Sequence, residues 1–263
     1  MTELQKRVIT GAILIPIVLG ALILGGYYFL AFIVIFLTGG IVEFLRIRTI
    51  HHRLLLPLAL VTLIPFMILI SIPGIPLIYP VLLVIFLPWI IYPFYYVRGV
   101  GIGVYFSLFF EVLLLSFAGF SIFKAREYGF WVSLYFFVTI WYFDSACYLV
   151  GKRWGKHKLA ELVSPGKTWE GFIGGLVSLV PYVIFVKFLN LPGLGNWTFL
   201  FVSAYLITIV GQQGDLAESA IKREAGLKDS SNLFPGHGGI LDRTDSLVAA
   251  APFYFMLLNW LWK

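Results

Sequence analysis

Long apolar stretches alternate with short polar ones along almost the whole chain. A helix needs ~20 residues to cross the hydrocarbon core of a bilayer, and nine stretches approach that length. Only helices and closed barrels satisfy their own backbone groups in lipid, and runs of this length favour helices. The pattern therefore predicts an all-α integral membrane protein with about nine transmembrane helices, at residues 8–26, 28–45, 54–72, 77–97, 101–123, 128–150, 171–190, 196–217 and 246–262.

The first two predicted helices are separated only by Gly25, Gly26 and Tyr27, so we expect a tight helical hairpin there. The first apolar run follows Lys6 and Arg7, as a signal peptide would, but it is too long for a typical signal core. We therefore interpret it as a retained helix.

Composition supports a membrane protein without a separate soluble domain. The chain is 60% hydrophobic and 12% charged, with a mean hydropathy of +0.94, whereas soluble domains carry roughly 25% charged residues. The net charge of +6 forms no long basic block, which argues against a nucleic-acid partner. The single cysteine, Cys147, excludes an intrachain disulfide.

Charge distribution gives the predicted orientation. With nine spans, one side of the membrane receives only Lys124, Arg126, Lys187 and Lys263, and the other side receives the remaining 15 of the 19 Lys and Arg residues. The positive-inside rule then makes the richer side and the N-terminus cytoplasmic.

Both long polar loops, 151–170 and 218–245, fall on this cytoplasmic side. Chemistry-bearing residues are scarce in the loops of residues 1–125 and concentrated in residues 126–263. We therefore expect an N-terminal scaffold and a C-terminal catalytic region within one continuous membrane domain.

The densest polar stretch, 219–245, holds four cations, four carboxylates, one His and four Gly in 27 residues. Charges at a membrane are costly and tend to mark function. Just before and within this stretch, Asp215, Glu218 and Lys222 have the spacing of one helix face.

Asp242 and Asp245 stand at i and i+3 at the start of the last span. Capping of that helix would explain one of these carboxylates, but not both. If two helix ends brought Asp215 near Asp242, the oxygen-rich site would suit Mg²⁺. Gly238 and Gly239 would let backbone N–H groups approach phosphate oxygens closely.

The other polar loop contributes Asp144, which lies inside the sixth span, and the segment 164–168, Ser-Pro-Gly-Lys-Thr. This segment lacks the leading glycine of the P-loop pattern, so we reject a P-loop. The basic residues of 152–158 are typical of charges that hold a loop inside the cell. Lys167, fixed between Pro-Gly and the next helix, is the better candidate to contact a phosphate.

These two segments resemble the phosphatidate cytidylyltransferases, also called CDP-diacylglycerol synthases. Residues 219–245 follow the pattern S-x-x-K-R-x4-K-D-x5-P-G-H-G-G-x-x-D-R-x-D, and residues 144–171 follow D-S-x-x-Y…G…S-P-G-K-T-x-E-G. The resemblance covers about residues 140–253. One departure is Ala146-Cys147, where many members have Gly-Ala, and we interpret Cys147 as a packing residue.

The resemblance implies transfer of CMP from CTP to phosphatidate, giving CDP-diacylglycerol and pyrophosphate for phospholipid biosynthesis. It implies Mg²⁺ as cofactor, a homodimer, and a bacterial inner membrane location with the active site facing the cytoplasm. The expected metal ligands are Asp215 and Asp242, with Asp245 and Asp144 as further ligands or as ligands of a second cation. Lys167 and Arg243 join the catalytic set, and the expected substrate-binding residues are Ser164, Lys222, Arg223, Lys228, Asp229, His237, Gly238 and Gly239.

Two other classes of membrane protein remain as alternatives. A transporter would place polar residues in many spans, whereas here they gather at one surface. A CDP-alcohol phosphotransferase or lipid kinase would also be metal-dependent, but the D-x2-D-G-x2-A-R-x8-G-x3-D-x3-D pattern of the phosphotransferases is absent. Glu43 and Glu111 are intramembrane acids to which the sequence assigns no partner.

Overall fold

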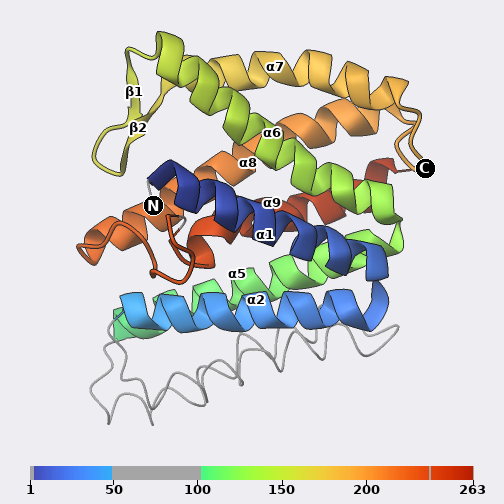
Figure 1. Ribbon diagram of the computed structural model, residues 1–263. Coiled ribbons are helices and arrows are strands. Elements are labelled where there is room, and N and C mark those ends of the chain that lie inside the picture. Colours follow the sequence, from blue (N-terminus) through green and yellow to red (C-terminus); the bar gives the residue numbers. More distant parts are fainter. Residues whose placement is uncertain (1–2, 49–101, 237, 263) are drawn as a thin grey trace.

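The computed structural model describes residues 3–48, 102–236 and 238–262, which form seven helices and one two-stranded hairpin (Figure 1). The predicted spans 54–72 and 77–97 lie outside the described residues. The elements are α1 (Glu3–Leu24), α2 (Gly26–Ile47), α5 (Ile102–Glu127), α6 (Phe130–Trp154), β1 (Lys158–Ala160), β2 (Ser164–Thr168), α7 (Trp169–Phe188), α8 (Trp197–Glu224) and α9 (Leu241–Leu261).

Four described helices, α2, α6, α7 and α8, are long and apolar enough to cross a membrane. The helix bounds follow the predicted spans closely at α1 and α2, where Gly25 alone forms the predicted tight connection, with φ of +61°. They differ at α8, which continues to Glu224 rather than ending near residue 217. The extra turns keep Asp215 and Lys222 on one helix, as the spacing predicts.

The helices pack in a connected series. Helix α8 lies along α9 and α6 lies along α7, while α5 contacts both α9 and α2. The buried core joins side chains from both halves of the chain, including Phe29 of α2, Phe136 of α6 and Tyr254 of α9. The predicted scaffold and catalytic regions therefore share one core among the described residues.

Small residues allow α6 and α7 to approach closely. A Cβ atom at Gly171 would lie 2.7 Å from the carbonyl oxygen of Cys147, and one at Gly175 would overlap the Cys147 sulfur. The half-buried thiol of Cys147 thus fills the space between the two helices, in agreement with its interpretation as a packing residue.

The contact between α8 and α9 is equally close. A Cβ atom at Gly214 would overlap that of Ala249 and lie 2.9 Å from the carbonyl oxygen of Asp245. This approach sets Asp215 beside the first turns of α9. The packing of Gly214 of α8 against Ala249 of α9 therefore brings Asp215 close to the segment that carries Asp245.

Residues 158–168, predicted as part of a loop, form a short antiparallel hairpin. The hydroxyl oxygen of Thr168 accepts a hydrogen bond from the backbone N–H of Gly171 and so caps α7. Glu170, in the first turn of α7, accepts hydrogen bonds from the backbone N–H groups of Lys156 (3.0 Å) and His157. These bonds fix the hairpin, and with it Lys167, against the start of α7.

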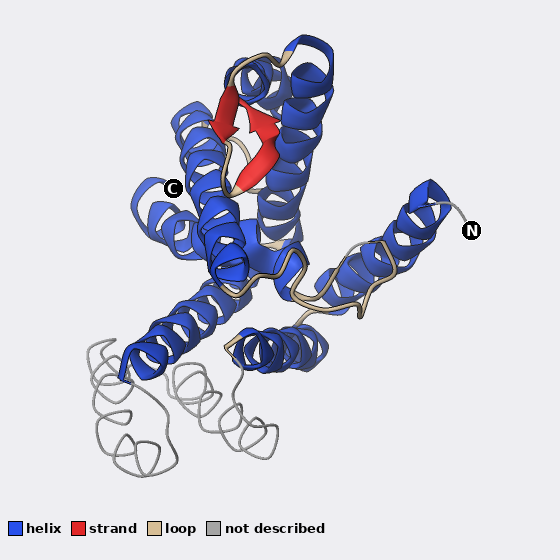
Figure 2. Ribbon diagram, turned by 90° about the vertical axis from the view of Figure 1, so that its left-hand side faces the viewer, coloured by secondary structure: helices blue, strands red, loops and turns tan. Residues whose placement is uncertain are grey.

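Both polar segments lie at the same end of the helix assembly, as predicted. Figure 1 shows the hairpin and the α8–α9 loop at the end where α1 begins, with the C-terminus at the opposite end. Figure 2 looks at the hairpin end, where the two strands lie among helix ends. Aromatic residues gather at the opposite end, where Tyr128 packs edge-on against Trp262 and Lys187 lies over Trp197, an arrangement typical of a membrane interface.

We predict that Gly175→Ala lowers the free energy of unfolding by about 1–3 kcal/mol, because a methyl group there overpacks the α6–α7 contact. Combining it with Cys147→Ala should recover part of the loss, since a ring carbon of Phe143 still lies 2.9 Å from the new Cβ. Thermal unfolding in detergent measures the stability of the single and of the double variant. The control is Gly20→Ala, whose Cβ has no described atom within 4 Å; equal stability of Gly175→Ala and this control would contradict the contact.

Candidate active site

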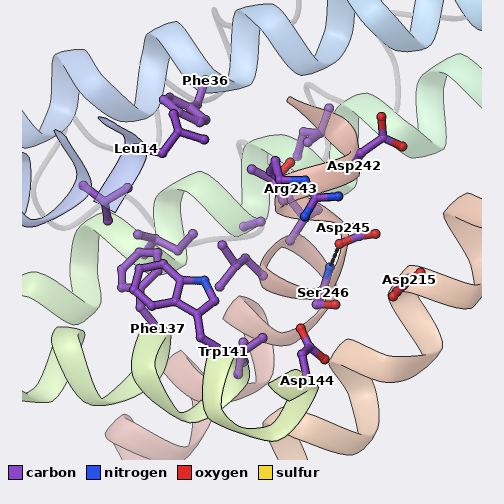
Figure 3. Close-up of a pocket in the computed structure, with 18 of the residues that line it drawn as sticks. Leu14, Phe36, Phe137, Trp141, Asp144, Asp215, Asp242, Arg243, Asp245 and Ser246 are labelled. Atoms are coloured by element: carbon purple, nitrogen blue, oxygen red, sulfur yellow. Dashed lines mark hydrogen bonds between the residues drawn. The ribbon is translucent and has the colours of Figure 1, made fainter. Parts of the chain in front are cut away.

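A cavity of about 520 Å³ opens between the N-terminal helices and the polar segments. Figure 3 shows Leu14 and Phe36 on one side of it and Asp215 and Asp245 on the other. Its apolar wall comes from α1, α2, α5 and α6, and its polar wall from α6, the hairpin, α8, the α8–α9 loop and α9. The cavity is therefore amphipathic, and its polar wall includes Asp144, Ser164, Asp215, Ser219, Lys222, Arg223, Lys228, Asp229, Asp242, Arg243 and Asp245.

A buried lysine lies at the centre of the polar wall. Lys222, which is 5% exposed, forms ion pairs with Asp242 and, at 3.0 Å, with Glu218. A charge buried this deeply is strongly destabilising without such partners. Lys222 thus holds α8 to the start of α9. A substrate phosphate, which the sequence predicted as a partner of Lys222, would have to compete with these two carboxylates for its ammonium group.

The carboxylate of Asp242 is fully engaged within the protein. Its Oδ1 pairs with Lys222, while its Oδ2 accepts the backbone N–H groups of Gly239 (2.7 Å) and Ser230 (2.8 Å) and lies 2.8 Å from the Ser230 hydroxyl. Gly238, with φ of +76°, lies so close that a Cβ there would overlap Oδ2. In this structure Asp242 therefore holds the α8–α9 loop, and Gly239 gives its N–H to Asp242 rather than to an open phosphate position.

Glu43 of α2, to which the sequence assigned no partner, reaches the same loop. It is 4% exposed. Its Oε1 accepts hydrogen bonds from the Ser231 hydroxyl (2.7 Å) and the Ile240 N–H (3.0 Å), and its Oε2 accepts the Leu241 N–H (3.0 Å). The Ser230 hydroxyl lies 2.8 Å from Oε2. In the sequence, the only indication of this role is that Glu43 is an acidic residue within a predicted membrane span.

Lys167 of the hairpin pairs with Asp215 of α8 at 2.6 Å, and the Ser219 hydroxyl lies 3.3 Å from the other Asp215 oxygen. Both partners of the ion pair are partly exposed, at 24% and 27%. The two polar segments that the sequence identified are therefore joined by one ion pair at the cavity.

Three carboxylates face a common space, as Figure 3 shows for Asp144, Asp215 and Asp245, whereas Asp242 is turned away from them. Asp144 and Asp245 both lie close enough to Asp215 for their charges to repel. No described residue hydrogen-bonds Asp144, and Asp245 accepts the backbone N–H of Ser246 (2.7 Å). These oxygens retain lone pairs that can bind a cation.

Among residues 3–48, 102–236 and 238–262, no group of three or more His, Cys, Asp or Glu side chains forms a ready metal cage. Mg²⁺ does not require one, because it is commonly held by one or two carboxylates and by phosphate oxygens of a substrate. The donor set of Asp144, Asp215 and Asp245 fits that mode of binding.

The other predicted residues differ in their positions and contacts. Arg223 donates to the carbonyl oxygens of Val163 (3.2 Å) and Leu227 (2.9 Å), so it ties α8 to the hairpin loop. Lys228 and Asp229 are exposed at the cavity rim. Ser164 and Arg243 also line the cavity, and His237 lies outside the described residues.

We predict that Gly239→Ala disorders the α8–α9 loop, because its Cβ would overlap the Ser230 hydroxyl and the carboxylate of Glu43. Hydrogen–deuterium exchange should become faster at the amides of 239–241, which lose their carboxylate acceptors. Gly195→Ala, with no described atom within 4 Å of its Cβ, serves as control. Unchanged protection in Gly239→Ala would mean that the loop does not depend on this close approach.

Comparison with known proteins finds relatives named phosphatidate cytidylyltransferase. A phosphatidate cytidylyltransferase of Haemophilus influenzae is 50% identical over 130 residues, which cover 48% of this chain and 45% of that protein. Those of Staphylococcus haemolyticus and Bacillus subtilis are 45% identical over 142 residues and 42% identical over 161 residues, covering 54% and 55% of their lengths. The chain thus spans about half the length of the curated relatives it matches.

The match to a family is broader than these pairwise alignments. Residues 5–261 match the cytidylyltransferase family, so the agreement includes the helices that supply the apolar wall as well as the polar segments. The chain belongs to the cytidylyltransferase family.

Proposed function

We propose that this protein transfers CMP from CTP to phosphatidate, giving CDP-diacylglycerol and pyrophosphate. The observation that carries the proposal is the amphipathic cavity, whose apolar wall meets a wall of charged residues. Phosphatidate has the same division, with acyl chains at one end and a phosphate monoester at the other. The curated relatives named phosphatidate cytidylyltransferase support this substrate.

The cavity walls suggest how the lipid would bind. Leu14 of α1, Phe36 of α2 and Ile122 of α5 line the apolar side, where acyl chains would lie. The lipid phosphate would then reach the side lined by Arg243 and the rim lined by Lys228. Cations placed in this way would bind phosphate oxygens through charge-assisted hydrogen bonds.

The reaction needs no activated protein nucleophile. A phosphate monoester has a second pKa near 6 and is largely ionised at neutral pH. One of its oxygens attacks the α-phosphorus of CTP, forming a new P–O bond while the bond from that phosphorus to the bridging oxygen breaks. Pyrophosphate leaves with the electron pair. The protein contributes alignment and charge neutralisation, as is usual in phosphoryl-group chemistry.

We further propose Mg²⁺ as cofactor, held by Asp215 with Asp245 and Asp144, which could also hold a second cation. When bound, the ion would neutralise charge on the triphosphate. Asp242 remains in the predicted ligand set only if it releases Lys222 or the donors on its other oxygen. Its present bonds favour a role in holding the α8–α9 loop.

Two of the basic residues predicted to bind phosphates, Lys167 and Lys222, are paired with carboxylates of the protein in this structure. Lys167 is paired with Asp215 across the cavity wall, and arriving phosphate oxygens would compete with that carboxylate for its ammonium group. Lys222 is buried between two carboxylates and would neutralise them rather than move. Arg243 and Lys228 also line the cavity and are the further cations that we propose for contact with phosphates.

We propose that the polar end of the molecule faces the cytoplasm, where CTP is available, and that the protein is a multi-pass protein of a bacterial inner membrane. The bacterial relatives and the four apolar helices support a membrane location. A homodimer is also proposed, on the resemblance to the family alone.

We predict that Asp215→Asn abolishes pyrophosphate release from CTP and phosphatidate, because it removes a cation ligand and the partner of Lys167. The measurement is release of pyrophosphate by purified protein in detergent with Mg²⁺ and both substrates. Omission of phosphatidate, or chelation of Mg²⁺, should stop release in the wild-type protein.

The matched control for this variant is Lys156→Ala. The side chain of Lys156 is exposed on the hairpin loop, and only its backbone N–H bonds to Glu170. We expect near wild-type activity. A fully active Asp215→Asn protein would refute the cation assignment, and a complete loss in Lys156→Ala would shift the reacting centre toward the hairpin.

A further inference from the structure

Helix α2 belongs to the half of the chain that the sequence interpreted as scaffold, yet it contacts the motif loop through a buried carboxylate. Glu43 accepts from Ser231 Oγ, Ile240 N and Leu241 N, and the hydroxyl of Ser230 also lies within hydrogen-bond distance. These partners are separated from Glu43 by 187 to 198 residues of sequence. The bonds therefore determine where the loop and α9 lie relative to α2.

The start of α9 explains why a carboxylate is needed. Its N-cap residue, Ile240, makes no side-chain capping bond of its own, and the first N–H groups of a helix lack intrahelical acceptors. Glu43 supplies acceptors for Ile240 and Leu241 from another helix and places negative charge at the positive end of the helix dipole. It acts as a cap provided by a distant segment.

The same helix also lines the apolar wall of the cavity. Phe36 lies seven residues before Glu43 on α2, so the two share a helix face, and Phe36 borders the cavity. One residue past the N–H groups that Glu43 accepts, Asp242 begins the part of the polar lining that α9 supplies, followed by Arg243 and Asp245. Helix α2 therefore carries part of the apolar wall and, through Glu43, also holds the start of α9, which carries part of the charged wall.

We propose that Glu43 is a positioning residue for the transfer reaction. By capping α9, it fixes Arg243 and Asp245 relative to the apolar wall, so that a lipid held by its chains presents its phosphate at the reacting centre. The inference rests on the cytidylyl transfer proposed above. Glu43 itself is not among the residues that line the cavity, and in this assignment it does not contact the substrates.

Glu43→Gln is the most specific test, because each carboxylate oxygen of Glu43 accepts a backbone N–H group, Ile240 N at Oε1 and Leu241 N at Oε2. Backbone N–H groups cannot reverse their role, so the amide nitrogen of Gln would face a donor it cannot satisfy. We expect kcat to fall about 10- to 100-fold, as small displacements of reacting groups cause. The KM for phosphatidate should change less than kcat, because the apolar wall that holds the acyl chains is untouched while Arg243 moves with the start of α9.

The experiment uses full-length purified protein in detergent micelles with phosphatidate, CTP and Mg²⁺. The number of CTP-binding sites per molecule is measured by equilibrium dialysis, and kcat is expressed per binding site. A positioning role predicts full CTP-binding stoichiometry with a lower kcat. A purely structural role predicts fewer competent molecules that each retain normal kcat, and that result would overturn the proposal.

Glu224→Gln is the matched control. Glu224 also links α2 to another helix, through a 3.1 Å ion pair with Arg48, but its side chain is 69% exposed, and exposed pairs contribute little. We expect its kcat to equal that of the wild-type protein. A loss equal to that of Glu43→Gln would mean that any weakening of the α2 contacts suffices, and would overturn the specific role of Glu43.

Ser231→Ala gives a second test, which also covers failure of Glu43→Gln to fold. It removes one donor to Glu43 and leaves the bonds of Asp242 intact, so kcat should fall less than in Glu43→Gln, at full CTP-binding stoichiometry. Combined with Glu43→Gln, it should add nothing, because Ser231 acts through Glu43. Unchanged kcat in Ser231→Ala would refute the proposal. An inactive wild-type protein would instead refute the transfer reaction itself.

Discussion

Two buried carboxylates, Glu43 and Asp242, hold the start of α9, and the arrangement of the cavity depends on them. The loop before α9 would otherwise bury backbone N–H groups without acceptors, each at a cost of about 1–3 kcal/mol. Glu43 accepts Ile240 N and Leu241 N, while Asp242 accepts Gly239 N and Ser230 N. The loop is therefore fixed by acceptors rather than by an apolar core.

This constraint explains several features of the sequence that would otherwise be unrelated. Gly238 and Gly239 are small because carboxylate oxygens and a serine hydroxyl occupy the space of their side chains. Lys222 is buried because Asp242 and Glu218 require a counter-charge. Gly214 lets α8 approach α9, which brings Asp215 beside the cavity that both helices line.

The sequence predicted the described helices and singled out the two polar segments that contribute to the cavity wall, because both depend on local patterns. Runs of apolar residues marked each described helix, with the largest difference at the end of α8, which continues to Glu224 rather than ending near residue 217. The spacing of Asp215 and Lys222 placed them on one helix. It did not predict the hairpin at 158–168, whose strands are too short to show a period. It also could not assign Glu43, because a contact across more than 180 residues leaves no local signal.

The role predicted for Gly238 and Gly239 stays a prediction. Gly238 and Gly239 were predicted to bring backbone N–H groups to a phosphate, which is a common use of glycine at a helix start. In the structure that position is filled by the protein's own carboxylates. In the proposed function, the cations that line the cavity bind the phosphates, and Asp144, Asp215 and Asp245 are the proposed ligands of a metal ion.

The most direct measurement compares CTP labelled with ³²P at the α-phosphate and at the γ-phosphate. Purified protein would be incubated with phosphatidate, Mg²⁺ and either nucleotide, and the label in the organic phase would be counted. Cytidylyl transfer predicts lipid-associated label from the α-phosphate alone, with the γ-label leaving as pyrophosphate. Label reaching lipid from the γ-phosphate would identify a kinase, and no label from either position would contradict a transfer reaction at this cavity.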